Sequence, residues 1–119
     1  MDELSSDLTH LGRLMDAAAL RTRVIAHNMA NVNTPGFTRS KVLFEAQLAE
    51  ALTRGGRGAG LEVRPEVALD PGGDVKVDGN NVHMEDEMAE LVKTTILYNI
   101  INRIVSGRIE GLRTAIRGQ

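Results

Sequence analysis

The sequence predicts a mainly α-helical, elongated protein. Two long terminal helices pack as a coiled-coil-like pair, with a short middle helix and a small β-ribbon or loop insertion between them. Two observations predict this fold. Apolar residues recur at alternating steps of four and three near both ends of the chain, and residues that favour turns gather between the two stretches. We therefore divide the 119 residues into an N-terminal helix over 1–33, a central region over 34–81 and a C-terminal helix over 82–119.

The N-terminal helix is predicted by a heptad seam in which Thr22 fills the single gap. Its apolar positions are Leu4, Leu8, Leu11, Met15, Ala18, Ile25, Met29 and Val32. Such a repeat is typical of a helix that packs along one face against another helix. The segment Asn33-Thr34-Pro35-Gly36 follows. Asn tolerates the left-handed conformation at a helix end, and Pro prevents the helix from continuing, so we expect the helix to stop there.

The C-terminal helix is predicted by a second seam with the same alternation, in which Thr95 occupies one position. The other positions are Met84, Met88, Leu91, Tyr98, Asn102, Val105, Ile109, Leu112 and Ile116. Asn102 is a polar residue within this apolar seam, and two interpretations stay open for it. It fixes the register or the oligomeric state of the packed helices, or it faces water.

The C-terminal helix also has more apolar residues than one partner helix can cover. Beside its seam lies an assembly strip that consists of Ile96, Leu97, Ile100, Ile101 and Ile104. A helix that is apolar around most of its circumference must be buried on several sides. This surplus fits either a helical hairpin with a large core or helical packing between many copies. Helices of this size are about 45 and 50 Å long, which predicts an elongated molecule.

The central region is predicted to hold one short helix and a ribbon. Phe44, Leu48, Ala51 and Leu52 have the spacing of an amphipathic helix of about ten residues. The glycine-rich residues 55–60 are expected to form a flexible link. Residues 61–64 and 74–77 alternate apolar and polar side chains on either side of a Pro-Gly-Gly turn, which predicts two paired strands.

Composition excludes several classes of protein. Without Cys the chain cannot form a disulfide, a thiolate zinc site or an iron–sulfur cluster. A net charge of −2 argues against a protein that coats nucleic acid. The N-terminus lacks the pattern of a cleaved signal peptide. The most apolar segment, residues 96–105, contains Asn and Arg, so it is not expected to cross a membrane.

Three segments come close to a functional motif but lack an essential residue. Residues 74–85 resemble a calcium loop, yet Lys76 stands where an oxygen ligand is needed. His83-Met84-Glu85 matches half of a zinc-deaminase motif that also requires Cys. Leu61 replaces the third Gly of a dinucleotide-binding fingerprint. We therefore expect no catalytic residue, no metal site and no cofactor.

The end of the first helix carries a more specific signal, because residues 24–37 resemble the asparagine-rich signature of bacterial flagellar axial proteins of the rod and hook. The matching residues are Asn28, Ala30, Asn31, Asn33, Thr34, Pro35, Gly36 and Phe37. Residues 78–82 and 87–89 are similar to the proximal-rod group within the flagellar basal-body rod protein family. Asn81 is expected to cap the second helix, since His83 stands where this group commonly has Asp.

The resemblance implies a structural subunit of the basal-body rod, whose terminal helices assemble into the helical rod that transmits motor torque. The implied partners are other copies of the chain, other rod proteins, the rotor-ring adaptor at the rod base and the flagellar type III export apparatus. The implied location is the periplasmic rod, reached without a cleaved signal peptide. Two alternatives are another axial subunit of rod or hook type and a small helical export chaperone or adaptor.

Overall fold

The computed structural model describes residues 2–118. Along the chain it contains helix α1 (Asp2–Ala30), strand β1 (Ser40–Leu43), helix α2 (Glu45–Gly60), strand β2 (Glu66–Leu69) and helix α3 (Met84–Arg117). Two long terminal helices, a shorter middle helix and a two-stranded ribbon confirm the predicted fold class.

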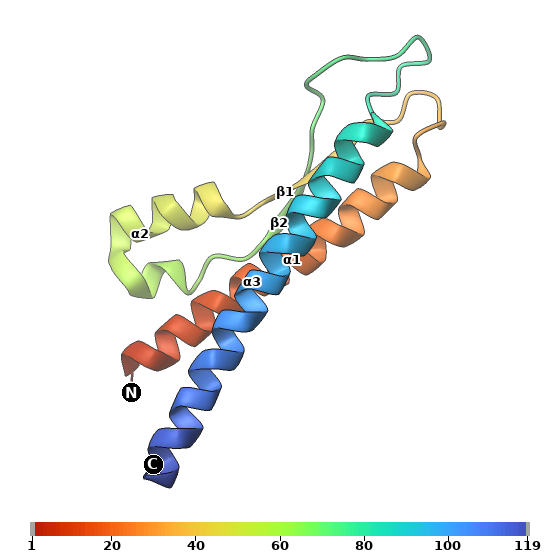
Figure 1. The fold of residues 1–119 in the computed structure, drawn as a ribbon. Helices are drawn as coiled ribbons and strands as arrows, with labels where there is room; N and C mark the ends of the chain where they lie inside the picture. The colour runs from red at the N-terminus through yellow and green to blue at the C-terminus, as the bar shows by residue number, and fades with distance from the viewer. Residues whose placement is uncertain (1, 119) are drawn as a thin grey trace.

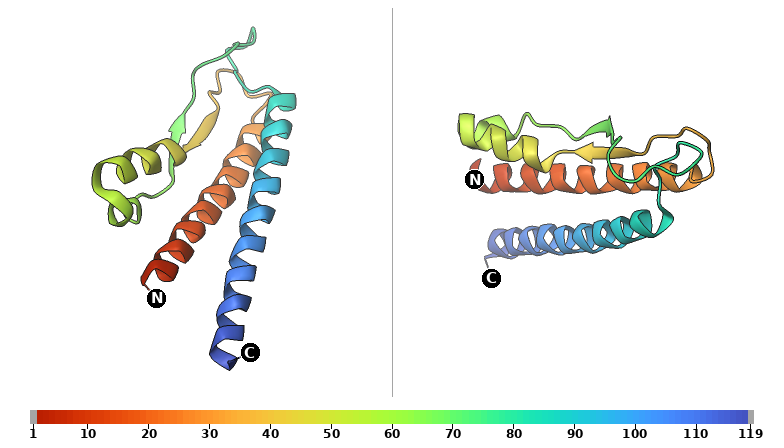
Figure 2. Two further views of the ribbon diagram at one scale, coloured as in Figure 1. Left: turned by 60° about the vertical axis from the view of Figure 1, so that its left-hand side comes forward. Right: turned by 90° about the horizontal axis from the view of Figure 1, so that it is seen from above.

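The molecule is elongated, as predicted. Its principal extents are 64 × 31 × 14 Å and its radius of gyration is 18.0 Å, whereas a compact chain of this length has a radius of gyration of about 13–14 Å. Helices α1 and α3 run antiparallel, so that both termini lie at one end of the molecule (Figure 1). Figure 2 shows α1 between α3 on one side and the ribbon with α2 on the other. The opposite side of α3 therefore has no covering element within residues 2–118.

Two side-chain contacts fix the register of the long helices. Near one end Asn28 of α1 contacts Glu87 of α3, and near the other Asp7 contacts Arg108. On each helix the two contacts are 21 positions apart, which corresponds to about 31 Å along an α-helix. The helices are therefore paired in register over most of the length of α1.

The ends of α1 and α3 next to the central region are secured differently. At the C-terminal end of α1, Asn31 Nδ2 donates to the His27 carbonyl and Lys76 Nζ donates to the Val32 carbonyl, both at 2.8 Å. The first donor satisfies a carbonyl group that the helix end leaves unpaired, and the second binds the turn that follows α1. At the start of α3 the capping position is His83, which makes no side-chain capping hydrogen bond. The expectation that Asn81 caps this helix is wrong, because its side chain bonds to the ribbon region instead.

Helix α2 differs from the prediction in its length. The expected flexible link at residues 55–60 is wrong, since α2 continues through these glycines to Gly60. The backbone bends at Gly56, where φ is +73°. Only glycine adopts this conformation readily, so the residue permits a kink between two helical pieces.

The predicted ribbon strands are also wrong. Strand β1 pairs antiparallel with β2, and Ser40 lies opposite Leu69 while Leu43 lies opposite Glu66. Residues 61–64 form a turn after α2, and residues 74–77 lie in the loop before α3. Both predicted strands had a plausible local pattern and a turn between them. The pairing that forms instead joins segments on either side of α2, and alternation within a single segment does not identify its partner.

The buried core is small and lies toward the loop end of the long helices. Its apolar members are Ala17, Ala18, Val24, Ile25, Val42, Phe44, Val82 and Ile101. Five polar residues are buried with them: Asn28, Asn80, Asn81, Glu87 and Thr94. Buried polar groups are costly unless they are hydrogen-bonded. The polar residues therefore determine how this end of the molecule is built.

Candidate functional site

The N-terminal seam lies against the rest of the subunit. All eight apolar positions predicted for it are buried or half-buried, and Ala18 and Ile25 are among the most buried residues of the chain. Seven of them lie on α1, and Val32 lies in the turn that follows. Thr22, which fills the gap, is exposed and donates to the Ala18 carbonyl.

The C-terminal seam divides into two groups. Met84, Leu91, Val105 and Leu112 are half-buried, whereas an exposed group consists of Met88, Tyr98, Asn102, Ile109 and Ile116. The residues of α3 that are buried are instead Glu87, Thr94 and Ile101. Each of these residues comes directly before a predicted seam position, namely Met88, Thr95 or Asn102. The buried face of α3 is therefore shifted by one residue relative to these three positions. Asn102 faces solvent in this subunit.

The assembly strip is also divided. Ile101 is 3% exposed and belongs to the core, while Ile96, Leu97, Ile100 and Ile104 are exposed. Val92 adds to the exposed side chains, and with Ile96, Ile100 and Ile104 it forms a row at intervals of four residues. We call these four residues the outer row; Ile96 and Ile100 are 55% and 50% exposed. Residues four apart lie on neighbouring positions of a helix face, so the outer row is a continuous apolar surface.

The asparagine-rich motif has one deeply buried member, Asn28. Its Nδ2 donates to the Ser40 carbonyl while its Oδ1 accepts from the Ser40 amide, both at 2.9 Å. The same Nδ2 donates to Glu87 Oε2 at 3.2 Å. One side chain on α1 therefore holds both β1 and α3. The sequence singled out Asn28 only as part of a motif, without these partners.

Apart from Ala30, which is the last residue of α1, the other motif residues form the turn that follows. Thr34 Oγ1 donates to Asn31 Oδ1 at 3.1 Å. Phe37 is half-buried and its ring meets the ring of His27 edge-on, with 5.6 Å between centroids. The exposed members are Ala30, Asn33, Thr34, Pro35 and Gly36. The turn thus has an exposed tip and a base that is fixed by side-chain hydrogen bonds.

Two asparagines from the loop before α3 fix this turn and the ribbon. Asn80 Nδ2 donates to the carbonyls of Asn31 and Thr34, each at 2.8 Å. Asn81 Oδ1 accepts from the Arg39 amide at 2.7 Å, and its Nδ2 donates to the Asp70 carbonyl at 2.7 Å. Both residues belong to the second resembling segment, and their side chains replace the backbone pairing that irregular loops lack.

An ion cluster around the buried Glu87 joins the ribbon to α3, and the sequence did not predict it. Arg39 Nε donates to Glu87 Oε1 at 2.7 Å, and its guanidinium also pairs with Asp70. The hydrogen bond to Glu87 raises the pKa of Arg39 above its ordinary value, against the opposing effect of burial. The Glu87 side chain is only 1% exposed. No sequence signal marks this acid, since Glu85 and Asp86 beside it are exposed.

Two glycines approach each other at the tip. Gly36 and Gly79 both have positive φ, at +73° and +85°. The Gly36 amide donates to the Asp78 carbonyl at 2.8 Å. A Cβ at Gly79 would lie 3.4 Å from the Gly36 Cα. The turn after α1 and the loop before α3 are therefore packed backbone against backbone.

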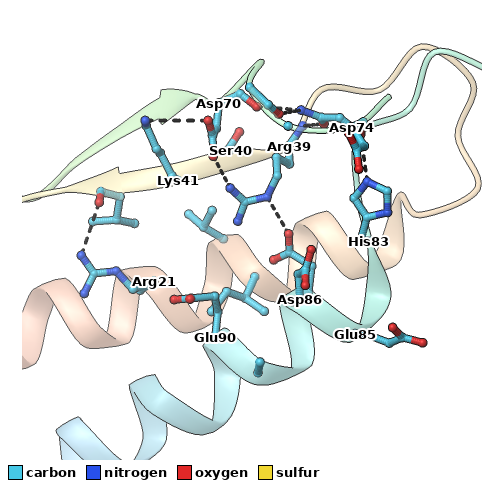
Figure 3. A pocket seen from close by; sticks show the side chains of 18 residues that line it. Arg21, Arg39, Ser40, Lys41, Asp70, Asp74, His83, Glu85, Asp86 and Glu90 are labelled. Carbon is cyan, nitrogen blue, oxygen red and sulfur yellow. Dashed lines mark hydrogen bonds and ion pairs between the residues drawn. The ribbon is translucent and has the colours of Figure 1, made fainter. Parts of the chain in front are cut away.

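Two adjoining hollows lie along α3. The larger, about 860 Å³, is a polar cleft between α1, the ribbon and the start of α3, and Figure 3 shows Arg39, Asp70 and Glu90 around it. The smaller, about 580 Å³, has Ile96, Leu97 and Ile100 on one side and Arg21 and Glu45 on the other. Arg21 donates to both carboxylate oxygens of Glu45, at 2.9 and 2.8 Å. This hydrogen bonding lowers the pKa of Glu45 below its ordinary value.

No group of three or more His, Cys, Asp or Glu side chains is placed to hold a metal ion among the residues that the structure describes. Within the same part of the chain, no helix is long and apolar enough to cross a membrane. The arrangement offers a rigid polar junction and an exposed apolar helix face, which are features suited to assembly.

Comparisons with known proteins agree with this arrangement. Residues 8–38 match a family model described as flagella basal body rod protein. The chain is 35% identical to flagellar basal body rod protein FlgB of Borrelia hermsii, and the match covers 97% of both chains. It is 27% identical to FlgB of Bacillus subtilis, over 99% of this chain and 98% of the relative. FlgB of Borreliella burgdorferi is also 27% identical, over 97% of both chains.

Proposed function

The chain belongs to the FlgB family of flagellar basal body rod proteins, and from this premise we propose how it takes part in the rod. It is a structural subunit of the basal-body rod. We propose that it lies in the proximal rod, where α1 and α3 pack against neighbouring subunits to form the helical structure that transmits motor torque. Within this proposal residues 1–33 and 82–119 are the axial helices and residues 34–81 connect them.

The observation that carries the proposal is the outer row on α3. Val92, Ile96, Ile100 and Ile104 are exposed, although Ile101, which lies between Ile100 and Ile104 in the sequence, is buried. Soluble monomers rarely expose large continuous apolar surfaces, and such a surface usually marks an interaction site. In this proposal the outer row is the interaction site, and neighbouring subunits cover it in the assembled rod.

The shape of the subunit supports the same conclusion. Pairing between α1 and α3 extends from Asn28–Glu87 to Asp7–Arg108, so the two helices present a long, continuous lateral surface. When one surface of a subunit binds a different surface of the next and the rotation does not close, the contact generates a helical assembly. An elongated subunit with an uncovered helix face is suited to that kind of contact.

The proposal includes partners and location. The partners are other copies of this chain, other rod proteins, the rotor-ring adaptor at the rod base and the flagellar type III export apparatus. We place the chain in the periplasmic part of the basal body, exported without a cleaved signal peptide and without a catalytic role. Near full-length similarity to rod proteins favours this function over a small helical export chaperone or adaptor.

The test combines localisation with a charged substitution in the outer row. A tagged wild-type chain is expected to remain in purified basal bodies, where immunogold electron microscopy places it in the rod. The double substitution Ile100→Asp and Ile104→Asp should leave the free subunit folded, because both side chains are exposed. It should prevent incorporation, because burying unpaired carboxylates in an interface is costly.

The matched control is the double substitution Val75→Asp and Val77→Asp, which introduces the same charges at exposed apolar residues of the loop before α3. Circular dichroism and thermal unfolding establish that both variants fold. Rods that contain the Ile100→Asp and Ile104→Asp chain at the wild-type level contradict the assignment of the outer row as an interface.

A further inference from the structure

The two edges of the ribbon differ in what binds to them. Along β1, the amide and the carbonyl of Ser40 are both bound by the Asn28 side chain. Farther along the same strand, the Val42 carbonyl accepts from Arg21 Nη2 at 3.3 Å. Asn28 and Arg21 both belong to α1, so α1 side chains take the place that a third strand would occupy beside β1.

The outer edge of β2 has no such partner. The Asp70 amide donates to the Arg39 carbonyl at 2.9 Å, and along an antiparallel ladder hydrogen-bonded pairs alternate with pairs that are not hydrogen-bonded. In the observed register Val67 and Leu69 are therefore in the pairs that do not bond across to β1, and their amides and carbonyls point outward. Within residues 2–118 no hydrogen bond reaches these four backbone groups.

The side chains along this open edge are apolar and exposed. Val67 and Leu69 are 50% and 68% exposed. Val67 lies opposite Val42, so both side chains are on one face of the ribbon, yet Val42 is buried. The cover on this face therefore ends between the two strands. An exposed apolar edge with unpaired backbone groups is a template for a further strand.

Prolines limit how far a further strand can pair. Pro65 and Pro71 lie on either side of β2 and Asp70, and proline has no amide hydrogen to donate. Pairing is therefore confined to Val67 and Leu69, so a partner segment needs about five extended residues. Figure 2 shows the ribbon on the side of α1 away from α3, so a strand bound at β2 leaves the outer row uncovered.

The charges beside this edge favour one kind of partner over another. Antiparallel pairing of two copies through this edge would bring Glu66 of each opposite Asp70 of the other, and like charges directly opposite each other are destabilising. Glu66 is hydrogen-bonded to the neutral side chain of Gln47, and within the described residues it has no cationic partner. A partner strand with a basic residue opposite Glu66 would therefore be favoured, and a second β2 strand would not.

We propose that the outer edge of β2 binds an extended segment of a different protein as a third, antiparallel strand. The segment has apolar residues opposite Leu69 and Val67, and the next residue toward its C-terminus, opposite Glu66, is Lys or Arg. The amides and carbonyls of Val67 and Leu69 make four backbone hydrogen bonds to it. The inference goes beyond the proposed function, because β2 belongs to the central region and not to the axial helices.

A second copy of this chain does not present such a segment outside its helices. Residues 61–64, Leu-Glu-Val-Arg, have the required order of side chains. Their backbone is already bonded, however, because the amides of Leu61 and Val63 donate to the carbonyls of Gly58 and Gly60, each at 3.2 Å. The partner strand therefore comes from another protein.

The test uses the capped peptide TVTVRT, whose two valines and arginine match the proposed segment. It is added in excess to the isotope-labelled full chain, and amide NMR spectra are recorded. We expect saturable shifts confined to residues 66–70, with the amide protons of Val67 and Leu69 moving downfield as they gain acceptors. Binding should be weak, because a short free peptide loses its conformational freedom when it pairs, so NMR is preferred over methods that need tight binding.

Methylation of the peptide backbone separates strand pairing from simple apolar contact. N-methylation of both valines removes the donors that face β2, and it should weaken binding at least tenfold. N-methylation of the first two threonines removes donors on the opposite edge of the peptide and should leave the affinity unchanged, because successive residues of a strand direct their backbone groups to opposite sides.

Variants of the chain test the other side of the contact. Leu69→Pro removes an outward amide but no hydrogen bond between β1 and β2, and proline is tolerated on an edge strand. It should weaken binding of TVTVRT at least tenfold. Glu66→Lys should bind TVTVRT less tightly and TVTVET more tightly than wild type does, because the opposite charges are then exchanged. The control Val75→Ala changes an exposed apolar side chain of the loop before α3 and should bind TVTVRT as wild type does.

Three results overturn the proposal. The first is the absence of saturable shifts at residues 66–70. The second is equal affinity for the two methylated peptides, which indicates apolar contact without strand pairing and decides the matter even if Leu69→Pro does not fold. The third is an unchanged preference between the two peptides in Glu66→Lys. All these measurements use the free subunit, so their failure leaves the proposed function in the rod standing, and absence of the chain from basal bodies leaves the β2 edge untouched.

Discussion

Glu87 of α3 accepts a hydrogen bond from Asn28 of α1 through one carboxylate oxygen, at 3.2 Å, and from Arg39 through the other, at 2.7 Å. Asn28 in turn holds the backbone of Ser40 through two hydrogen bonds. A single buried acid therefore connects the two long helices and the ribbon. Because each oxygen has a donor, the charge of this buried carboxylate is compensated.

Glu87→Ala is expected to destabilise the subunit by about 2–3 kcal/mol, because it removes hydrogen bonds to a charged group and leaves buried donors unpaired. The free energy of unfolding in urea measures this loss. Glu85→Ala is the matched control, since it removes an exposed acid from the same turn of α3. Equal unfolding free energies for the two variants contradict the structural role of Glu87.

The Arg21–Glu45 pair predicts a dependence of stability on pH. Hydrogen bonds from Arg21 lower the pKa of Glu45 below its ordinary value of 4.5. The stabilisation is therefore fully present above pH 4.5 and is lost as pH falls through the lower pKa of the folded state. The Glu45 side chain is about half exposed, so we expect no more than about 1 kcal/mol.

The measurement compares wild type with Glu45→Gln in urea at several pH values. The difference in unfolding free energy should be largest near neutral pH and should shrink as pH falls below 4.5. A difference that stays constant from neutral to acidic pH contradicts an ionic contribution from this pair.

Gly36→Val should impair incorporation into rods more than it impairs expression. Gly36 has φ of +73°, a conformation that costs a β-branched residue about 1–3 kcal/mol. Gly72→Ala is the control, because Gly72 lacks a positive φ and a Cβ there would make only an ordinary contact. Soluble expression, motility and the amount of chain in basal bodies are measured. Normal motility of the Gly36→Val strain contradicts a role for this turn in assembly.

Gly107→Ala and Gly111→Ala should each stabilise the free subunit by about 0.5–1 kcal/mol. Both residues lie within α3, and a Cβ at either position meets no other atom within 4 Å. Alanine restricts the unfolded chain more than glycine does and favours the helix. Thermal unfolding of the free subunit measures the effect. A loss of stability in either variant would show that α3 is not a regular helix there.

The long helices could be predicted from the sequence because heptad spacing is a local property. The face of α3 that meets α1 could not be predicted with the same accuracy. The predicted positions Met84, Leu91, Val105 and Leu112 are half-buried. The buried residues, however, are Glu87, Thr94 and Ile101 rather than Met88, Thr95 and Asn102. When a helix is apolar around most of its circumference, periodicity alone does not select among neighbouring rows.

The polar junction could not be predicted because its partners are distant in sequence. Glu87 lies 59 residues from Asn28 and 48 from Arg39. No local pattern links them, and an acid in the first turn of a helix usually faces solvent. The prediction of the ribbon strands was wrong for the same reason, since the strand that pairs with residues 66–69 lies before α2. Motif resemblance located Asn28, Asn80 and Asn81, and the structure supplied their partners.

The most direct test of the outer row as an assembly surface is chemical labelling of Ile100→Cys. In the free subunit this side chain is exposed, so a maleimide should label it rapidly. In purified basal bodies we expect labelling to slow at least tenfold, because a neighbouring subunit covers the outer row. Glu62→Cys, at an exposed position outside α3, is the control and should label in both states. Equal labelling of Ile100→Cys in the free subunit and in the rod would contradict the proposal that α3 packs through this face.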